Sequence, residues 1–330
     1  MVGLLATGLG MIGARPSTSP GTTSSFDHPV SITSDGTHVW VADYSNDSVT
    51  ELKAQTGAVI ETIKLGKSTP YGPSAISSNG GRVWVASRSG VAVSELNATT
   101  GKLIQTLPAS TKPGHALDLA VYGSRLWVAS FDPASVREFN AGTGALIRSL
   151  SARKYKELAK LTYVAADASH VWVLGPPLTE LSESTGVPIR EIGGGASHLF
   201  DLPRAMSDDG IHVWVANFKS DSVVEINART GAVVRVIQGP KHHLTRMFSL
   251  PVAIASDRVH VWVTNIGNDS VTELNARTGA LIKVLKGAQF GFHLPYGISS
   301  DGVHVWIAND TGNSVTELNA RTGALVRVIR

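Results

Sequence analysis

The chain has 330 residues, no cysteine, and a formal net charge of +3 from 29 basic and 26 acidic side chains. The lack of cysteine excludes disulfides, thiol catalysis and metal sites built on thiolates. The near balance of charge is atypical of proteins dedicated to nucleic acids or membrane surfaces, so we expect neither partner. No stretch approaches the roughly 20 apolar residues that span a bilayer, so we expect no membrane span.

The N-terminal residues 1–27 differ in composition from the rest of the chain. About 13 apolar or small residues come first, and a tract rich in Ser, Thr, Pro and Gly follows. This order is typical of a secretion signal, although the charged residues that normally precede the apolar core are missing. We therefore expect a truncated signal segment and an exported protein, extracellular or in the cell envelope. The alternative is an ordinary unstructured tail on a cytoplasmic protein.

From residue 28 onward the chain repeats one phrase seven times. The last copy reads SVTELNARTGALVRVI, and the phrase occupies residues 48–63, 92–107, 135–150, 177–192, 222–237, 270–285 and 314–329. Each copy follows one of the seven tryptophans. The interval from the Trp to the Thr of the Thr-Gly pair is 16 residues in six copies, as from Trp306 to Thr322, and 13 in the fourth, from Trp172 to Thr185. A constant interval of this kind indicates a repeat architecture.

Each unit has the pattern of four short strands. In the last copy we expect them over 295–299, 304–308, 314–319 and 324–329, because apolar residues alternate or run in short stretches bounded by Gly, Asn, Asp and Pro. The second strand is apolar on both faces, so both faces should be covered. Gly323, between the third and fourth strands, can supply the positive φ of a tight hairpin, for example one with a glycine bulge.

A single four-stranded sheet cannot cover two apolar faces, whereas a closed ring of such sheets leaves no uncovered end. Seven units of about 44 residues therefore predict an all-β fold, a seven-bladed β-propeller of four-stranded antiparallel blades, as one domain over residues 28–330. The first unit begins with its first strand and the last ends with its fourth. We expect the ring to close by packing between blades 1 and 7, without an exchanged strand.

A glutamate recurs five residues before the Thr of every copy. In the last copy Glu317 should face Arg327 across the hairpin, and a basic residue recurs at the latter position in five copies. We interpret these as cross-strand ion pairs, which stabilise a sheet modestly, in preference to a ring of cation ligands. Blades 1 and 2 break the pattern with Glu61 and Gln105. The seven glutamates are Glu51, Glu95, Glu138, Glu180, Glu225, Glu273 and Glu317.

A histidine stands two residues before the Trp in five copies. Side chains two apart on a strand share a face, so each blade should hold its own His–Trp pair. We expect a packing or hydrogen-bonding role for these histidines in preference to metal binding. The loops that follow the second strands resemble cation loops in composition, but they lack the spacing of a calcium motif. The histidines are His38, His170, His212, His260 and His304, with Arg82 and Arg125 in the other two copies.

Departures from the repeat are better candidates for function, because a ligand rarely has seven-fold symmetry. The loops between blades and those after the second strands should emerge together beside the inner strands, on what we call the loop face. At the channel mouth on this face we expect Arg204 and Tyr296, directly after the first-strand proline, and Asp118 and Tyr163 one position further on. Blade 4 has a short loop that should leave a notch beside the joint at 151–160.

Further polar residues should reach in from the rim. The joint between blades 5 and 6 supplies Lys241, His242, His243 and Arg246, and His293 precedes blade 7. Together with the four residues at the channel mouth, this set suits a small polar or anionic ligand. The alternative is a water-filled channel with solvated loop charges.

Two segments resemble known repeats. WIANDTGNSVTELNARTG, residues 306–323, closely resembles the YVTN-type bacterial β-propeller repeat, and DGVHVW, residues 301–306, resembles the NHL and streptogramin B lyase repeats. The likeness covers residues 28–330 and rests on repeat-level motifs, which specify fold better than function. Streptogramin (virginiamycin) B lyases resemble seven-bladed propellers with a magnesium-dependent site, built from His on an inner strand and Glu just after the second strand.

The lyase pattern is incomplete in this chain. The corresponding inner-strand positions hold no His, and those after the second strand hold no Glu, with Asp43 as their one acidic residue. His28 and His115 lie one or two places away, which does not restore the pattern. The departure puts the acid–base pair of a lyase in doubt.

These observations lead to one main hypothesis and two alternatives. We expect a non-catalytic, monomeric bacterial propeller, without a cofactor, that binds a ligand or a protein partner through its loop face. The first alternative is a lyase or hydrolase at the channel mouth, in which Asp43, Asp118 or a nearby His binds Mg²⁺. The second is a structural or sensory propeller, for which the sequence offers no test.

Overall fold

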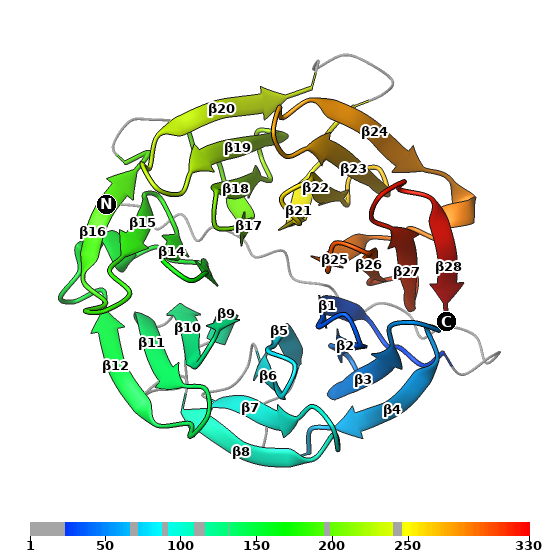
Figure 1. Cartoon of the computed structure of the whole chain (residues 1–330), viewed down its shortest axis with the longest axis horizontal. Helices are drawn as coiled ribbons and strands as arrows, with labels where there is room; N and C mark the ends of the chain where they lie inside the picture. The colour runs from blue at the N-terminus through cyan, green and yellow to red at the C-terminus, as the bar shows by residue number, and fades with distance from the viewer. Residues whose placement is uncertain are drawn as a thin grey trace, which may run out of the picture.

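The computed structural model describes residues 24–66, 72–87, 92–108, 116–131, 133–194, 199–239 and 246–330. Its strands form seven four-stranded antiparallel sheets arranged as a ring, as Figure 1 shows. The prediction of an all-β, seven-bladed propeller is therefore confirmed. In each blade the four strands follow one another in chain order, and we call them strands a to d from the channel outward.

The strand bounds are as follows. The a strands are β1 (Pro29–Ser34), β5 (Pro73–Ser78), β9 (Ala116–Tyr122), β13 (Tyr163–Ala166), β17 (Pro203–Asp208), β21 (Pro251–Ser256) and β25 (Pro295–Ser300). The b strands are β2 (His38–Asp43), β6 (Arg82–Ser87), β10 (Arg125–Phe131), β14 (Val171–Leu174), β18 (His212–Asn217), β22 (His260–Asn265) and β26 (His304–Asn309). The c strands are β3 (Ser48–Lys53), β7 (Ala92–Asn97), β11 (Ala134–Asn140), β15 (Leu178–Leu181), β19 (Ser222–Asn227), β23 (Ser270–Asn275) and β27 (Ser314–Asn319). The d strands are β4 (Val59–Lys64), β8 (Leu103–Pro108), β12 (Leu146–Ser151), β16 (Pro188–Ile192), β20 (Val233–Gln238), β24 (Leu281–Lys286) and β28 (Leu325–Ile329).

Two short 3₁₀ helices, η1 (Lys156–Leu158) and η2 (Ala288–Phe290), interrupt the joints before blades 4 and 7. Neither they nor any other helix in the described part of the chain has the length and apolar character needed to cross a bilayer.

The core lies between the blades. All seven tryptophans are at most 1% exposed, and each stands on a b strand within a run of at least four buried residues. The Trp306 side chain, for example, belongs to the same apolar cluster as Ile32 and Val39 of the next blade around the ring. Each blade thus covers the apolar face of its neighbour, as predicted from the apolar character of the b strands.

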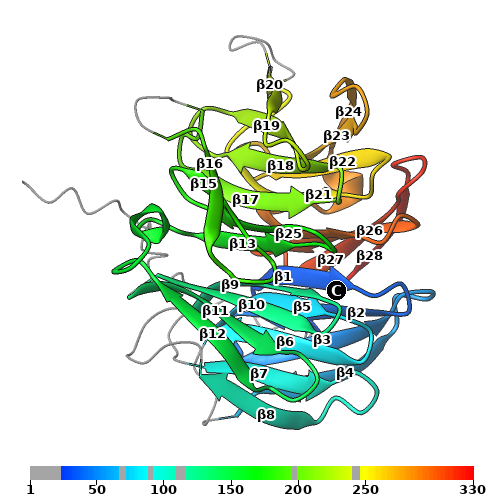
Figure 2. The same cartoon turned by 60° about the vertical axis from the view of Figure 1, so that its left-hand side comes forward.

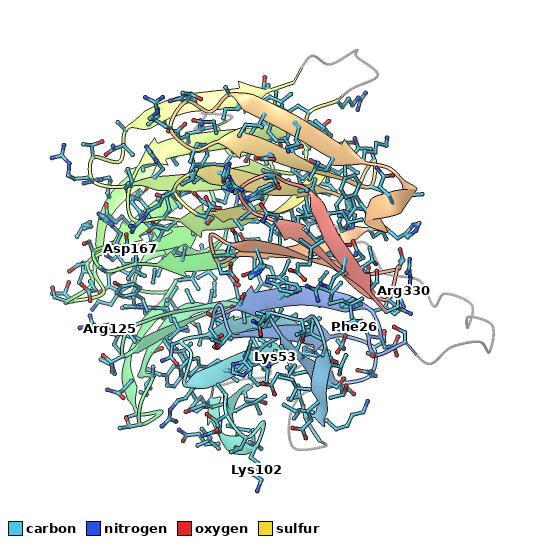
Figure 3. The ribbon with its side chains drawn as sticks, turned by 45° about the vertical axis from the view of Figure 1, so that its right-hand side comes forward. Phe26, Lys53, Lys102, Arg125, Asp167 and Arg330 are labelled. Carbon is cyan, nitrogen blue, oxygen red and sulfur yellow. The ribbon has the colours of Figure 1, made fainter. Side chains whose placement is uncertain are left out.

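The ring closes by packing between the first and last blades, as predicted, because β1–β4 and β25–β28 form separate sheets. Phe26 and Ile32 pack with Trp306 across this seam. The Ser34 hydroxyl donates a hydrogen bond to Asp301 Oδ2 at 2.8 Å. Phe26 and Arg330 accordingly lie on the same side of the molecule in Figure 3, and Figure 2 shows the blades from the side.

A hydrogen bond on the loop face ties several blades to the next. The Oδ1 atom of an Asp or Asn in the b–c loop accepts the backbone N–H of the residue before the next blade's first-strand proline. Both partners have positive φ, which is uncommon outside glycine, so the hydrogen bond offsets a local backbone cost. The pairs are Asp47 with Gly72 (2.7 Å), Asp221 with Leu250 (2.8 Å), Asp269 with Leu294 (2.8 Å) and, across the closing seam, Asn313 with His28 (3.0 Å).

The predicted register of the c–d hairpin is correct. Glu317 stands opposite Arg327, and Arg327 Nε lies 2.7 Å from Glu317 Oε2. The same ion pair forms in the four other blades that carry a basic residue there. The sequence predicted cross-strand ion pairs of modest effect, and the structure shows in addition that the glutamates are buried, Glu317 being 1% exposed. Their burial makes the partner on strand d more important than in an exposed pair.

The strand d base also reaches the next blade. Arg327 donates to the Thr56 carbonyl in the c–d turn of blade 1, and Lys283 donates to the Thr322 carbonyl in blade 7. The turn glycine permits this approach, because a Cβ on Gly57, whose φ is +68°, would lie 2.8 Å from Arg327 Cδ. The repeated phrase therefore encodes a contact between blades as well as the hairpin of one blade.

Blade 4 departs from the others in length. Its strands β13, β14 and β15 have four residues each. The joint that precedes it contains η1, and its Leu158 and Leu161 side chains are completely buried. A Cβ on Gly175, in the shortened b–c loop, would lie only 3.0 Å from the Lys160 carbonyl oxygen. This joint therefore packs closely where the sequence predicts a notch.

Replacing Arg327 with methionine should destabilise the closed ring. The variant leaves the buried Glu317 carboxylate without its strand d partner and removes the hydrogen bond to Thr56. We expect the free energy of unfolding to fall by about 2–4 kcal/mol, less than for a fully buried pair because 32% of the Arg327 side chain is exposed. Urea denaturation measures this difference.

Arg321→Met is the matched control, because Arg321 is an exposed residue in the turn of the same hairpin. It should change the free energy of unfolding by no more than about 0.5 kcal/mol. Equal losses in the two variants would show that Arg327 has no special role at the seam.

Candidate functional site

The central channel has two ends with different residues. Each a strand starts at the loop face, beside the b–c loops, and ends at the a–b turn on the other side of the ring. We call this second side the turn face. The candidate site predicted from the sequence belongs to the loop face.

Four predicted residues converge at the loop-face end of the channel. Asp118, Tyr163, Arg204 and Tyr296 stand at or near the start of β9, β13, β17 and β25, so they come from four different blades. Tyr163 interacts electrostatically with each of the other three. Because blades 4 and 7 lie across the ring from each other in Figure 1, the cluster reaches across the channel.

Local backbone geometry aims two of these side chains. Arg204 is the unpaired residue between the Pro203–Asn217 and Ala205–Ala216 pairs, and Tyr296 occupies the corresponding place in β25. A bulge of this kind bends a strand and redirects the side chain of the extra residue. The proline that starts each of these strands thus precedes a position that can point into the channel mouth.

Tyr163 is the centre of the cluster. Its hydroxyl lies close enough to Arg204 for the guanidinium to favour the ionised phenol. Burial is the main cause that raises the pKa of Tyr163 above its ordinary value, and Tyr296 and Asp118 add to the effect while Arg204 opposes it. Tyr163 therefore stays a neutral phenol at physiological pH and keeps an O–H group to donate.

Asp118 contributes a carboxyl group of intermediate acidity. Burial raises the pKa of Asp118 to about 7, while hydrogen bonds from the backbone N–H groups of Val164 and Leu119 lower it. The Val164 N–H donates to Asp118 Oδ2 at 3.0 Å. Near neutral pH Asp118 is therefore partly protonated and can both donate and accept a hydrogen bond.

Arg204 is only partly buried and carries the positive charge of the cluster. Its guanidinium carbon lies 5.1 Å from the centre of the Phe218 ring, a favourable cation–π distance. Within the described ranges no carboxylate forms an ion pair with Arg204. The Phe218 ring and the Tyr163 hydroxyl therefore lie beside the Arg204 guanidinium, which can still bind an anion.

The rim residues lie outside this cluster. Arg246 is 54% exposed at the joint before blade 6, where its Nη1 atom lies 3.8 Å from Asp221 Oδ2. His293 is exposed in the loop before β25, beside Gly312 of a b–c loop. Lys241, His242 and His243 lie outside the described residues. The structure thus gathers four of the nine predicted residues and places two at the rim.

Asp43, a candidate metal ligand under the lyase alternative, has a different environment. It is fully buried, and its carboxylate accepts a hydrogen bond from the Thr50 hydroxyl at 2.6 Å. Burial raises the pKa of Asp43 to about 7, and the Thr50 hydrogen bond opposes that rise. Blades 5, 6 and 7 carry asparagine at this position. We therefore assign Asp43 a structural role, as a hydrogen-bond partner within blade 1.

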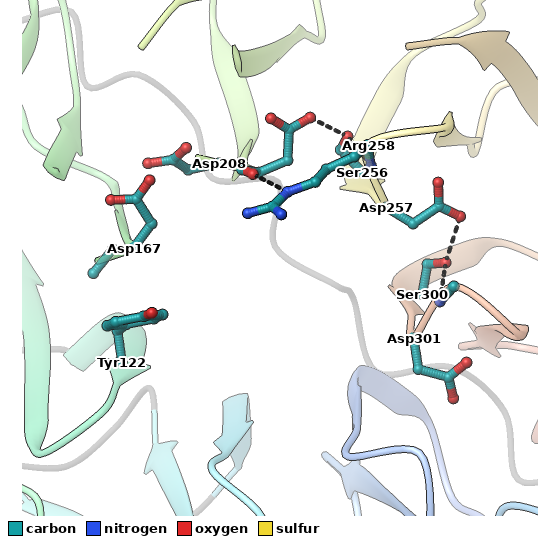
Figure 4. A pocket seen from close by; sticks show the side chains of 11 residues that line it. Tyr122, Asp167, Asp208, Ser256, Asp257, Arg258, Ser300 and Asp301 are labelled. Carbon is teal, nitrogen blue, oxygen red and sulfur yellow. Dashed lines mark hydrogen bonds between the residues drawn. The ribbon is translucent and has the colours of Figure 1, made fainter. Parts of the chain in front are cut away.

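Two cavities open toward the turn face. One of about 420 Å³ lies inside the channel and is lined by the later parts of all seven a strands. The other, of about 350 Å³, lies at its turn-face mouth among the side chains in Figure 4. None of the six predicted residues that the structure describes lines either cavity. The acidic residues at the mouth are Asp167, Asp208, Asp209, Asp257 and Asp301.

This acidic mouth is not among the sites predicted from the sequence. Four of these aspartates cap the a–b turns, where their carboxylates accept backbone N–H groups, as Asp301 does from His304 at 2.7 Å. Asp208 is different, because it occupies a position that holds serine in four other blades. That substitution is a departure from the repeat, and an alignment of the strand ends would have shown it.

Known structures share the fold of this chain. Hydrazine synthase of Kuenenia stuttgartiensis superposes with a TM-score of 0.69 at 16% identity, over 92% of this chain and 99% of that one. Virginiamycin B lyase of Staphylococcus aureus gives 0.68 at 14% identity, over 86% and 92%. The computationally designed Ika8 protein gives 0.64 at 14% identity, over 92% and 88%. These similarities support the predicted fold-level relation to the streptogramin B lyases.

No known family profile and no curated protein matches the sequence. At 14–16% identity the structural similarities establish the fold alone.

The raised pKa of Asp118 predicts a dependence of stability on pH. A carboxyl group whose pKa is about 7 in the folded state and near 3.8 in the unfolded state binds more protons when folded, so stability falls as pH rises from 4 to 7. Asp118→Asn keeps an acceptor for the Val164 N–H and removes the titration. We expect the midpoint of thermal unfolding to decline less in the variant than in the wild type over this range.

Asp201→Asn, on the surface beside Lys219, provides the control and should leave the wild-type profile unchanged. Parallel pH profiles for the wild type and Asp118→Asn would contradict the assignment of a raised pKa to Asp118.

Proposed function

We propose that the protein is a non-catalytic propeller that binds a small polar, anionic ligand at the loop-face mouth of its channel. The observation that carries this proposal is the cluster of Asp118, Tyr163, Arg204 and Tyr296. In the other blades the corresponding positions hold small or uncharged side chains, so the cluster breaks the symmetry of the ring. A binding site for one small ligand requires such an asymmetric set of polar groups.

The chemistry of the cluster favours a carboxylate or phosphate group. Arg204 offers a planar guanidinium that can donate two parallel hydrogen bonds to either group. Tyr163 and Tyr296 add hydroxyl groups, and Tyr296 is 37% exposed, so it can meet a ligand that enters from solvent. Partly protonated Asp118 can donate one more hydrogen bond to an anion.

The scaffold favours a preformed site. All four side chains stand on inner strands, and packing from both neighbouring blades holds those strands in place. Sites built on strands are more precisely positioned than sites on loops. Arg246 and His293 at the rim add positive charge or hydrogen bonds for a larger ligand, or for an acidic side chain of a protein partner.

We also propose that the protein is exported and acts as a monomer without a bound cofactor. Export is supported by the composition of residues 1–27, which is typical of a signal segment followed by a polar tail. The channel-mouth cluster needs no second subunit or cofactor to present its polar groups.

A thermal-unfolding screen against phosphate, citrate, malonate and nucleotides tests the proposal. A ligand that binds only the native state raises the unfolding midpoint. We expect a dicarboxylate or phosphate compound to do so, and Arg204→Ala to raise its dissociation constant at least about tenfold, because hydrogen bonds to a charged group contribute about 1.5–3 kcal/mol. Tyr163→Phe should weaken binding to a smaller extent.

Arg258→Ala is the control for the choice of face, because Arg258 lines the turn-face cavity. This variant should keep the ligand response. A ligand response that survives in Arg204→Ala would contradict the proposal. A response that disappears only in Arg258→Ala would also contradict it and would place binding on the turn face.

The alternative function is a magnesium-dependent lyase or hydrolase at the same mouth. The observation in its favour is that the pKa of Asp118, which burial raises to about 7, suits a general acid or base. A thermal shift that requires Mg²⁺ and is lost in Asp118→Ala would support the enzyme. A metal-independent shift that is lost in Arg204→Ala supports the binding propeller.

A further inference from the structure

Serine hydroxyls hold several seams together at the turn face. At the end of an a strand the serine hydroxyl donates a hydrogen bond to Oδ2 of the aspartate in the a–b turn of the preceding blade. This hydrogen bond stabilises the serine hydroxyl and the aspartate carboxylate, which are both partly removed from water. The pairs are Ser34 with Asp301 (2.8 Å), Ser256 with Asp209 (2.6 Å) and Ser300 with Asp257 (3.2 Å).

The seam between blades 4 and 5 lacks this donor. Asp208 occupies the serine position, and its carboxylate points toward the carboxylate of Asp167, the turn aspartate of blade 4 (Figure 4). Asp208 Oδ2 is closed off from solvent and has no hydrogen-bond partner within the described residues. Two facing carboxylates with no proton or cation between them are unfavourable, so this seam requires a positive group that the other seams do not.

His170 completes a set of three metal-binding side chains. Its Nδ1 atom lies 3.2 Å from an Asp167 oxygen, and potential ligand atoms of Asp167, His170 and Asp208 all lie within 4.8 Å of one another. Asp167 and Asp208 also line the turn-face cavity of about 350 Å³, which gives access from solvent. We propose that Asp167, His170 and Asp208 bind a divalent transition-metal ion at the seam between blades 4 and 5.

The donor set indicates which metals fit. One imidazole nitrogen and two carboxylate oxygens are typical ligands of Zn²⁺ and related first-row ions, whereas Ca²⁺ and Mg²⁺ favour oxygen ligands alone. Three protein ligands beside a cavity leave a coordination position for water. The metal would take the place that the serine proton occupies in the other seams, and it would cross-link blade 4, which has the shortest strands, to blade 5.

Neighbouring charged groups do not already neutralise this site. The Arg258 Nε donates to the Asp209 carbonyl at 2.7 Å, and within the described ranges Arg258 forms no ion pair with Asp167 or Asp208. Asp209 is itself satisfied by Ser256 and by the Trp214 indole N–H at 3.3 Å. Within the described residues, Asp167 and Asp208 therefore have no ion-pair partner other than His170, which leaves room for a metal ion between them.

Other blades provide internal controls. Blade 7 has the same turn aspartate and histidine, Asp301 and His304, 3.4 Å apart, but the serine hydroxyl of Ser34 faces Asp301. An Asp–His pair without the second carboxylate is the ordinary arrangement of this repeat, and it should not hold a metal. The extra aspartate in blade 5 is the decisive difference.

Isothermal titration of the chelator-treated full chain with ZnCl₂ at pH 7.5 tests the site. We expect one tight site per chain and a higher midpoint of thermal unfolding in the presence of Zn²⁺. Asp208→Ser introduces the residue that the repeat uses elsewhere, so it should fold normally and lose this site. His170→Gln should weaken binding at least about 100-fold, more than loss of an outer-shell partner does, and His304→Gln should have no effect.

Zn²⁺ binding that survives unchanged in Asp208→Ser would lie elsewhere on the chain and would overturn the proposal. No heat of Zn²⁺ binding would also overturn it.

Discussion

A buried carboxylate in each blade is the constraint on which the rest of the fold depends. The glutamate of strand c lies between a base on strand b and, in five blades, a base on strand d. Burial raises the pKa of Glu225 to about 7 even though Arg235 opposes the rise, which shows how strongly this place disfavours an unpaired charge. Keeping the glutamate ionised requires its partners, and its partners fix the register of three strands. The interval of five residues from this glutamate to the Thr of the Thr-Gly turn, constant in all seven copies, agrees with this requirement.

The same residues join the blades into a ring. The strand d base that pairs with the glutamate also reaches the turn of the next blade, while the apolar cluster around each Trp draws on two blades. The closing seam uses these contacts too, so the protein needs no exchanged strand. Against this regular background, departures are informative. Arg204 brings positive charge to the loop-face end of the channel, and Asp208 adds negative charge at the turn-face end, so the two ends suit ligands of opposite charge.

The number of blades and the register of the strands could be predicted from the sequence. The period of the repeat and the alternation of apolar and polar residues on the strands are compatible with few folds. The pairing of Glu317 with Arg327 follows from counting residues around one hairpin. The burial of that pair depends on the neighbouring blade, which no single copy of the repeat shows. The turn-face cavity depends on the spacing of all seven inner strands, and therefore on the packing of the whole ring. Asp208 was visible as a serine-to-aspartate change, but its facing partner Asp167 lies in another blade.

The central claim is that the channel-mouth cluster around Arg204 is an anion site. Anomalous diffraction from crystals soaked in iodide tests this claim directly, because a bound iodide gives a peak that identifies the residues around it. We predict a peak within contact distance of the Arg204 guanidinium and the Tyr163 hydroxyl, and its absence from crystals of Arg204→Ala. Peaks confined to the outer surface or to the turn face, with none at the channel mouth, would contradict the account.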